Sequence, residues 1–243
     1  SCNTRLFPCI ILKIYIGNLV FTNTTRSDLH LTRIEPLPAS CSMAENVKKN
    51  ISLNKINVDI EALNYPLMRF KKDQNSNLHK LLYRTHVERE NHYSEICKWI
   101  VSHILNEPAY VQVVPCYRVG FPLNRWVGCF HRDSDFGHSA AEINFICALT
   151  AMAGSSALQV EDYPGSFSYI SMDLLPGELI SFDHIDRLHG CKRNKTGEIV
   201  ISMDFRFIPL RLSAQAFSFA ASTVNTKMAL LPGSYFSSEP LLP

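Results

Sequence analysis

The sequence lacks several patterns that would place it in a protein class at once. Its 243 residues contain no CxxC pair, no internal repeat and no low-complexity tract, and 24 Lys and Arg are balanced by 22 Asp and Glu. A net charge of +2 excludes a basic face over the whole surface, so we expect no nucleic-acid partner. Hydrophobic residues make up 46% of the chain, which excludes disorder and provides for a substantial core.

Long uninterrupted apolar runs are also missing. The apolar stretch 6–21 is interrupted by a lysine and by Gly17 and Asn18, whereas a spanning helix needs about 20 apolar residues. We therefore expect no membrane span, although a basic residue before the run keeps a targeting sequence as an alternative. The Gly17-Asn18 pair predicts a β-hairpin with strands Lys13–Ile16 and Leu19–Thr22.

The eight cysteines follow no pairing rhythm. Several, such as Cys129 and Cys147, lie inside apolar runs, where a free cysteine acts as a small hydrophobic residue. No spacing of Cys and His resembles a structural zinc site. We therefore expect reduced thiols in an intracellular, reducing compartment, either the cytoplasm or an organelle.

The hydrophobic period divides the chain into helices followed by strands. Apolar residues in 76–106 recur at three- and four-residue steps, which predicts one long helix or two consecutive helices, capped by Ser76 or Asn77. After Pro108 the period is two residues, and turn-like separators divide the chain into short strands. The expected strands are Val111–Val114, Trp126–His131, Glu142–Leu149, Ser168–Met172, Glu178–Asp183 and Glu198–Ile208.

This order of elements predicts an α+β fold that is mainly β, either a sandwich, a jelly roll or a barrel, with the helices buttressing one sheet. We expect one domain over residues 1–243. It would consist of an N-terminal hairpin and helices (1–107), a β core (108–210) and a C-terminal extension (211–243).

The last expected strand alternates clearly between two faces. One face carries Ile199, Ile201, Met203, Phe205 and Phe207, and the other carries Val200, Ser202, Asp204 and Arg206. Taken alone, this strand is best interpreted as half-exposed, with its polar face in solvent. The alternative is a polar face that lines the mouth of a barrel and presents Arg206 to a ligand.

His131 and Asp133 are candidate metal ligands. In a strand, residues i and i+2 project from the same face, so both side chains could bind one ion from one side. A later histidine, His184 or His189, would complete a two-His-one-carboxylate set, which suits non-haem Fe(II). Arg206 follows 17 positions after His189, and an arginine there can hold a carboxylate by paired hydrogen bonds.

With this order of residues, the chain resembles the Fe(II)/2-oxoglutarate-dependent oxygenases, which have a double-stranded β-helix core (a jelly roll, cupin-like). Within that class it is similar to the streptomycin-biosynthesis oxygenase-like group, which is related to the phytanoyl-CoA hydroxylases. The likeness covers about residues 108–208, and residues 1–107 carry none. The segments that carry it include HRDSDFGH (131–138), EINFICALT (142–150), Leu188-His189-Gly190 and SMDFRF (202–207).

The resemblance implies a set of site residues. His131, Asp133 and His189 would bind Fe(II), with His184 as the alternative distal ligand. Arg206 would pair with the distal carboxylate of 2-oxoglutarate. Ser202 and Asn144 would lie near that co-substrate, O₂ would be the second co-substrate, and ascorbate would help turnover.

The resemblance also implies a small-molecule substrate, a natural-product intermediate that is oxidised at an unactivated C–H bond. We expect a carboxylate-bearing, amino-acid-like substrate and either hydroxylation or an oxidative ring closure like that of the kainoid synthases. The candidate arginines for the substrate carboxylate are Arg118, Arg125, Arg132 and Arg193. Asp133 excludes halogenation, because halide-binding relatives leave that position vacant.

Three alternatives stay open from the sequence. The first is a 2-oxoglutarate-dependent hydroxylase of another substrate class, such as an acyl chain, a nucleobase or a protein. The second is a cupin-like metal-dependent isomerase or lyase, in which Arg206 has no carboxylate to hold. The third is a non-catalytic binding barrel. The sequence does not predict an oligomeric state.

Overall fold

The computed structural model describes residues 13–15, 31–64, 75–125, 129–218, 221–223 and 226–243. The turn and second strand of the expected N-terminal hairpin lie outside the described residues. Its first strand is described as β1 (Lys13–Tyr15), which pairs in parallel with β2 (Leu31–Ile34).

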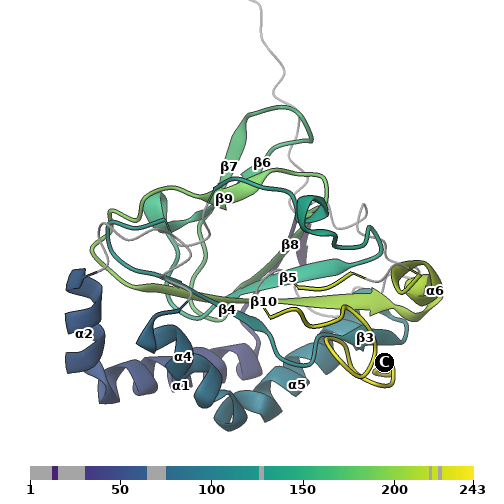
Figure 1. The fold of residues 1–243 in the computed structure, drawn as a ribbon, viewed down its shortest axis with the longest axis horizontal. Helices are drawn as coiled ribbons and strands as arrows, with labels where there is room; N and C mark the ends of the chain where they lie inside the picture. Colours follow the sequence, from purple (N-terminus) through teal and green to yellow (C-terminus); the bar gives the residue numbers. More distant parts are fainter. Residues whose placement is uncertain (1–12, 16–30, 65–74, 126–128, 219–220, 224–225) are drawn as a thin grey trace, which may run out of the picture.

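Two β-sheets form the centre of the molecule (Figure 1). The larger sheet has seven strands in the order β1-β2-β8-β5-β10-β3, with β4 beside β10, and the smaller sheet has the order β7-β6-β9. Apart from β1 with β2, the described strand pairs are antiparallel. The fold is therefore a jelly roll of the double-stranded β-helix type, which confirms the expected class. The remaining strands are β3 (Ala109–Val111), β4 (Cys116–Gly120), β5 (Ile143–Ala148), β6 (Leu158–Glu161), β7 (Tyr169–Met172), β8 (Leu179–Phe182), β9 (His189–Cys191) and β10 (Val200–Pro209).

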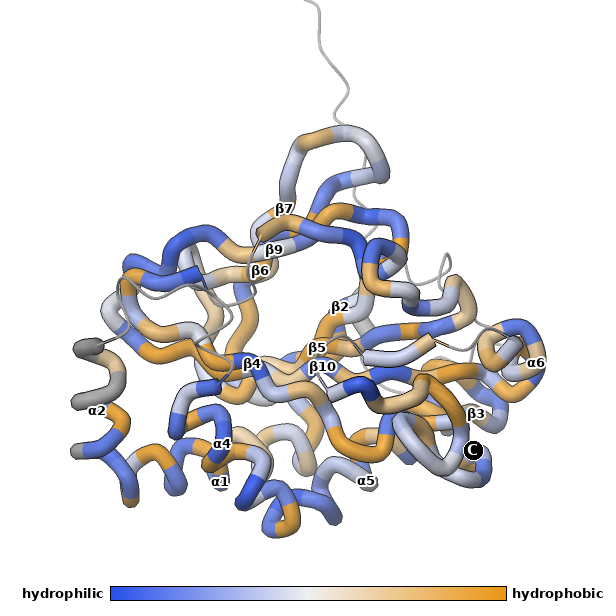
Figure 2. The backbone as a smooth tube through the Cα atoms, in the orientation of Figure 1, coloured by the Kyte–Doolittle hydropathy of each residue, from blue (hydrophilic) through white to orange (hydrophobic). Residues whose placement is uncertain are grey.

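Helices cover the outer face of the larger sheet (Figure 1). Among the described residues, the helices on this face are α1 (Pro38–Leu53), α2 (Lys55–Asn64), α4 (Asn77–Arg84) and α5 (Glu90–Ile100). The short α6 (Ser213–Ala216) lies beside the end of β10 instead (Figure 1). Along α1, α4 and α5 the tube in Figure 2 changes repeatedly between hydrophobic and hydrophilic colours, as amphipathic helices do. None of the described helices is both long and apolar enough to cross a membrane.

The helical prediction for residues 76–106 is confirmed as consecutive helices. The Ser76 side chain accepts a hydrogen bond from the backbone N–H of His79, as an N-cap does. A 3₁₀ turn (His86–Arg89) separates α4 from α5, and a π-helical turn (Val101–Leu105) extends α5. Asn106, in the left-handed conformation at φ 51°, ends the helix before Pro108.

Most of the expected strands are confirmed, with shifts at their ends. The first expected strand, 111–114, is confirmed only at Val111, where β3 ends. Gln112 forms an isolated bridge, and Val113 and Val114 are exposed. The expected strand Trp126–His131 is also wrong within the described residues, since His131 forms only an isolated β-bridge. Its residues 126–128 lie outside the described part of the chain.

The half-exposed interpretation of the last strand is wrong, because every residue of β10 is buried. One face of β10, with Phe205 and Phe207, belongs to the core between the larger sheet and the helices. The other face is covered by the second sheet, and Val200 packs there against Leu158 and other apolar side chains. Its polar residues are therefore enclosed between the two sheets.

The cysteines of the described residues are all free. These are Cys41, Cys97, Cys116, Cys129, Cys147 and Cys191. Burial raises the pKa of the Cys97 and Cys147 thiols well above the ordinary value, so both stay protonated at neutral pH.

Phe205 lies at the centre of the main core and provides a test of it. Its ring packs edge-on against Tyr93 at 5.4 Å between centroids and also contacts Phe207 at 5.7 Å. We expect Phe205→Ala to lower the free energy of unfolding by about 3–5 kcal/mol in urea denaturation. Leu53→Ala is the control, because the Leu53 side chain is 73% exposed at the end of α1, and it should stay within about 0.5 kcal/mol of the wild type. Equal losses in the two variants would contradict this description of the core.

Candidate metal centre

Backbone pairing brings two histidines together from distant parts of the chain. His131 and His189 face each other in an antiparallel bridge, and each N–H donates to the other carbonyl at 3.0 Å. His189 begins β9, while His131 precedes a 3₁₀ turn (Asp133–Phe136). Asp133 therefore does not share a strand with His131, and the argument from strand alternation is wrong. Its backbone is held instead by the His184 carbonyl, which accepts from the Asp133 N–H at 3.0 Å.

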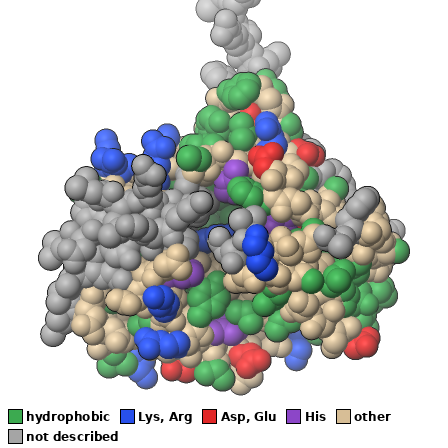
Figure 3. All heavy atoms as spheres, in the orientation of Figure 1, with side chains coloured by type: hydrophobic (Ala, Val, Ile, Leu, Met, Phe, Trp, Pro, Cys, Tyr) green, Lys and Arg blue, Asp and Glu red, His purple; other side chains and the backbone are tan. Residues whose placement is uncertain are grey.

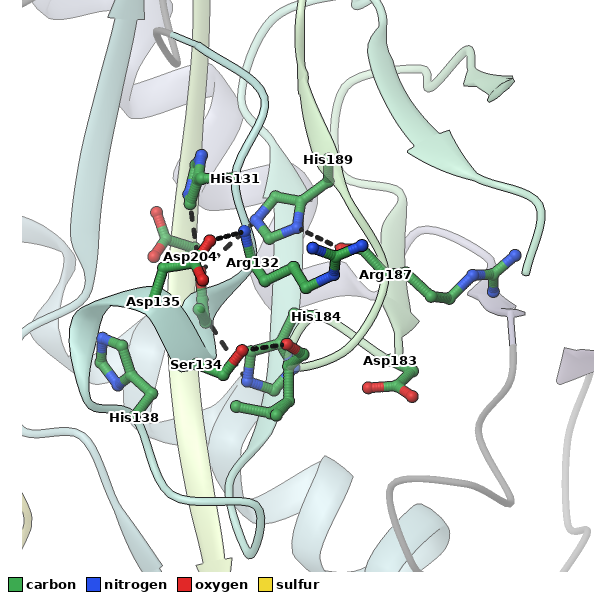
Figure 4. A network of polar contacts seen from close by, with 12 residues as sticks. His131, Arg132, Ser134, Asp135, His138, Asp183, His184, Arg187, His189 and Asp204 are labelled. Atoms are coloured by element: carbon green, nitrogen blue, oxygen red, sulfur yellow. Dashed lines mark hydrogen bonds and ion pairs between the residues drawn. The ribbon is translucent and has the colours of Figure 1, made fainter. Parts of the chain in front are cut away.

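Three side chains form a group that could hold one metal ion. Potential ligand atoms of His131, Asp133 and His189 lie within 4.8 Å of one another. The Asp133 Oδ1 is 3.6 Å from the Nε2 of His131 and 3.4 Å from the Nε2 of His189. Figure 4 shows the rings of His131 and His189 near each other, with His184 on the other side of the network. The structure thus brings His189, and not His184, into the group.

The hydrogen bonds of the two histidines suit metal binding. The Nδ1 of His131 is 3.0 Å from the Cys129 carbonyl, and the Nδ1 of His189 is 3.1 Å from the Arg187 carbonyl. A carbonyl only accepts, so each Nδ1 carries the proton and donates it. In the neutral form of each ring this leaves the lone pair on Nε2, which lies on the side of Asp133. A backbone partner on the outer nitrogen is what fixes the tautomer of a metal-binding histidine.

Asp133 is buried but ionised. Burial by itself would raise its pKa, but the adjacent Arg206 guanidinium outweighs burial and holds the pKa well below the ordinary value. The carboxylate therefore presents a full negative charge at neutral pH. Two imidazoles and one carboxylate form a donor set that fits a divalent cation.

His184 lies behind Asp133 and is fully buried. Its Nε2 is 3.9 Å from the Asp133 Oδ2, and neither ring nitrogen has a hydrogen-bond partner among the described residues. Burial lowers its pKa to about 4, so its ring is neutral at pH 7.

Arg206 extends from β10 to the outer oxygen of Asp133. Its Nη2 donates to the Asp133 Oδ2 at 2.7 Å, and its Nη1 donates to Asp204 at 3.3 Å and to the Tyr235 hydroxyl at 3.1 Å. Its Nε lies 3.3 Å from a carboxylate oxygen of Glu142. Arg206 therefore lies among three carboxylates of the chain itself.

Arg118, from β4, approaches the same network from the side. Its Nε donates to one oxygen of Asp204 at 2.7 Å and its Nη2 to the other at 3.3 Å. Burial alone would raise the pKa of Asp204, but Arg118 and Arg206 hold it below the ordinary value. Asp204 thus links the two arginines.

A cavity between the sheets joins these residues. Figure 3 shows this face of the molecule hollowed, with histidine and basic side chains at the hollow. In the described part of the chain the cavity is lined by Arg118, His131, Asp133, Asn144, Ile146, Met152, Leu158, His189, Ser202, Asp204 and Arg206. The Oδ1 of Asn144 is buried and has no partner among the described residues, so it can accept a hydrogen bond from a ligand.

The other residues singled out from the sequence lie outside this cavity. Arg125 and Arg193 are exposed. Arg132 is partly exposed beside His131, and its Nε donates to the Asp186 carbonyl at 2.8 Å. Asp135 accepts from the Arg132 N–H, and His138 pairs with Glu142 at 2.8 Å.

Sequence reasoning missed three members of the network. Asp204 was placed on the polar face of the last strand together with Arg206, and this shared face was a usable signal. Glu142 follows His138 at a spacing of four, which is common in loops and helices alike. Tyr235 comes from the C-terminal part of the chain, and no local pattern connects it to Arg206.

Gly190 sets the approach of the two histidine segments. A Cβ at this position would lie 3.0 Å from the Cα of Phe130, a backbone atom next to His131. We expect Gly190→Ala to push the segments apart and to weaken binding of Co(II), followed by its visible absorption, on the order of tenfold. Gly154→Ala is the control, because a Cβ there has no atom within 4 Å and meets only the strain of φ +56°. If Gly190→Ala binds Co(II) as the wild type does, this close approach does not set the ligand spacing.

Comparison with known proteins finds a similarity to a streptomycin biosynthesis protein. No family model matches the sequence. The streptomycin biosynthesis protein StrG of Streptomyces griseus is 31% identical over 140 residues, which cover 56% of this chain and 65% of StrG. The matched segment thus spans less than two thirds of that relative.

Solved structures of non-haem enzymes are also similar. The non-haem monooxygenase ThoJ (apo) has 13% identity and a TM-score of 0.48, covering 73% of this chain and 74% of ThoJ. A prolyl hydroxylase from Trichoplax adhaerens, in complex with a hypoxia-inducible-factor peptide, has 12% identity and a TM-score of 0.46, covering 78% and 88%. The likeness to StrG confirms the resemblance to the streptomycin-biosynthesis group that the sequence motifs indicate.

Proposed function

We propose that this protein is an Fe(II)/2-oxoglutarate-dependent oxygenase that oxidises an unactivated C–H bond of a small, carboxylate-bearing molecule. The observation that carries the proposal is the group of His131, Asp133 and His189, whose potential ligand atoms lie within 4.8 Å of one another. Two histidines and one carboxylate leave adjacent coordination positions open for a co-substrate and O₂. The similarity to StrG supports a role in natural-product biosynthesis.

The residues of the chain would hold and orient the reactants. When bound, Fe(II) with 2-oxoglutarate and O₂ supplies the oxidising power, and 2-oxoglutarate leaves as succinate and CO₂. The ionised Asp133, with His131 and His189, would hold the metal. Ser202 and Asn144 offer polar atoms to the co-substrate within the cavity. The apolar side chains of Ile146 and Met152 in the cavity wall limit the access of water.

We further propose an amino-acid-like substrate that is hydroxylated or closed into a ring. Its carboxylate needs a cation near the metal but outside the co-substrate position. Arg132 meets this requirement, because it adjoins His131 and its side chain is 33% exposed. Its Nη2 lies 3.9 Å from a carboxylate oxygen of Glu161, a distance that a bound acid can compete with.

The first experiment measures succinate formed from 2-oxoglutarate with Fe(II), O₂ and ascorbate. We expect turnover by the wild type, a loss of at least about a hundredfold in His131→Ala and His189→Ala, and loss on chelation that Fe(II) restores. His92→Ala is the control, because its half-exposed side chain on α5 lies outside the cavity lining, and it should behave as the wild type. A wild type that binds metal but forms no succinate would favour a cupin-like isomerase or lyase. A wild type that binds neither would contradict the proposal.

The second experiment tests the substrate class. Amino-acid-like acids that stimulate succinate formation are compared with their amides in the wild type. We expect Arg132→Gln to raise the apparent KM for the acid by about tenfold while leaving the KM for 2-oxoglutarate unchanged. The matched control is Arg193→Gln, an exposed arginine outside the cavity. Equal use of acid and amide by the wild type would contradict a carboxylate-bearing substrate.

A further inference from the structure

Two arginines reach the cavity, and their surroundings differ. Arg206 is buried, and its guanidinium already contacts Asp133, Asp204, Glu142 and Tyr235. Its Nη1 and Nη2 donate hydrogen bonds to groups of the chain itself, and its Nε lies 3.3 Å from Glu142 without a hydrogen bond. A further carboxylate at Arg206 would meet three like charges, which opposes binding.

Arg118 has the opposite properties. It contacts a single carboxylate, Asp204, through the edge formed by Nε and Nη2. Its Nη1 has no hydrogen-bond or ion-pair partner among the described residues. The Arg118 side chain is 29% exposed and lines the cavity. The edge formed by Nη1 and Nη2 is thus available for a second, paired contact with a carboxylate.

The contact between Arg206 and Asp133 indicates a different role for Arg206. The Oδ1 of Asp133 faces the Nε2 atoms of His131 and His189, and its Oδ2 accepts from Arg206 at 2.7 Å. The Oδ1 is thus directed toward the two histidines, and the Oδ2 is held by Arg206 on the opposite side of the carboxylate. Removal of the Arg206 contact would let the carboxylate rotate about its side-chain bonds, since the nearest other donor to Oδ2, His184, is 3.9 Å away.

From these contacts we propose that Arg118 binds the distal carboxylate of 2-oxoglutarate and that Arg206 is a positioning residue that orients Asp133. This assignment rests on the proposed function and reverses the role that the sequence resemblance implies for Arg206. Ser202 supports it, because Ser202 and Arg118 are opposite each other in the pairing of β10 with β4, and both line the cavity. The Ser202 hydroxyl is therefore in a position to donate to the same carboxylate.

The test compares two co-substrates that differ only in the distal group. Binding of 2-oxoglutarate and of 2-oxopentanoate, which lacks the distal carboxylate, is titrated anaerobically in the Fe(II)-loaded protein by calorimetry. The wild type should prefer 2-oxoglutarate on the order of 10- to 100-fold, as a charge-assisted pair of hydrogen bonds provides. In Arg118→Gln this preference should fall nearly to one, while Fe(II) affinity stays within about threefold of the wild type.

Arg206→Lys should give the reverse result. Lysine keeps the charge between the carboxylates but cannot contact Asp133, Asp204 and Glu142 together, so Fe(II) affinity should fall by about 10- to 100-fold. At saturating Fe(II) the preference for 2-oxoglutarate should remain. If Arg206 only stabilised the fold, its substitution would reduce the Fe(II) affinity and the preference for 2-oxoglutarate together. A loss of Fe(II) affinity alone therefore identifies Arg206 as a positioning residue. Arg193→Gln is the control and should change neither.

The outcomes distinguish this assignment from the proposed function. A wild type with no Fe(II) affinity, or with no preference between the two acids, contradicts the proposed function itself. A wild type with a preference that Arg118→Gln retains and Arg206→Lys loses overturns only the assignment. Circular dichroism checks the fold of each variant. If Arg118→Gln does not fold, Arg118→Lys is measured in its place. A reduced preference for 2-oxoglutarate over 2-oxopentanoate in this variant supports the assignment, and an unchanged preference overturns it.

Discussion

The ion pair between Arg206 and Asp133 is the interaction on which the rest of the site depends. Both groups are buried between the two sheets, where an unpaired charge is costly, so each requires the other. The pair connects β10 of the larger sheet to the segment that carries His131. That segment is in turn bridged to β9 of the smaller sheet through His189. One electrostatic contact thus ties the two layers together at the metal position.

The two interfaces of the larger sheet, one with the helices and one with the smaller sheet, differ in composition. Between the helices and the larger sheet, aromatic side chains such as Phe145 and Phe205 form a continuous core. Between the two sheets, apolar contacts occupy one part and the charged network the other. Because β5 and β10 belong to both compartments through their alternate residues, the packing of the first fixes the orientation of the polar side chains in the second.

The sequence predicted the alternation of β10 but not the surroundings of its polar face. Alternation depends on the residues of one strand, whereas burial of the second face depends on β6 and β9, which come from elsewhere in the chain. The same limit applies to Asp133. It was expected beside His131 because of strand alternation, but it lies in a 3₁₀ turn. The short β9 and the 3₁₀ turn at Asp133 arise from tertiary contacts, and three or four residues carry too little periodicity to predict them. The bounds of helix α1 were not predicted, for another reason. The helix buries polar residues such as Ser40, whose hydroxyl donates to the Gly177 carbonyl, and these residues interrupt the apolar pattern on its buried face.

The bridge between His131 and His189 has a consequence for ion binding. The two imidazoles are attached to main-chain segments that hold each other by a reciprocal pair of hydrogen bonds. The bridge therefore fixes the separation of the two main-chain segments, and the carbonyls of Cys129 and Arg187 hold the orientation of the two rings. An ion held between these histidines would therefore meet a spacing of segments that the main chain sets before the ion binds.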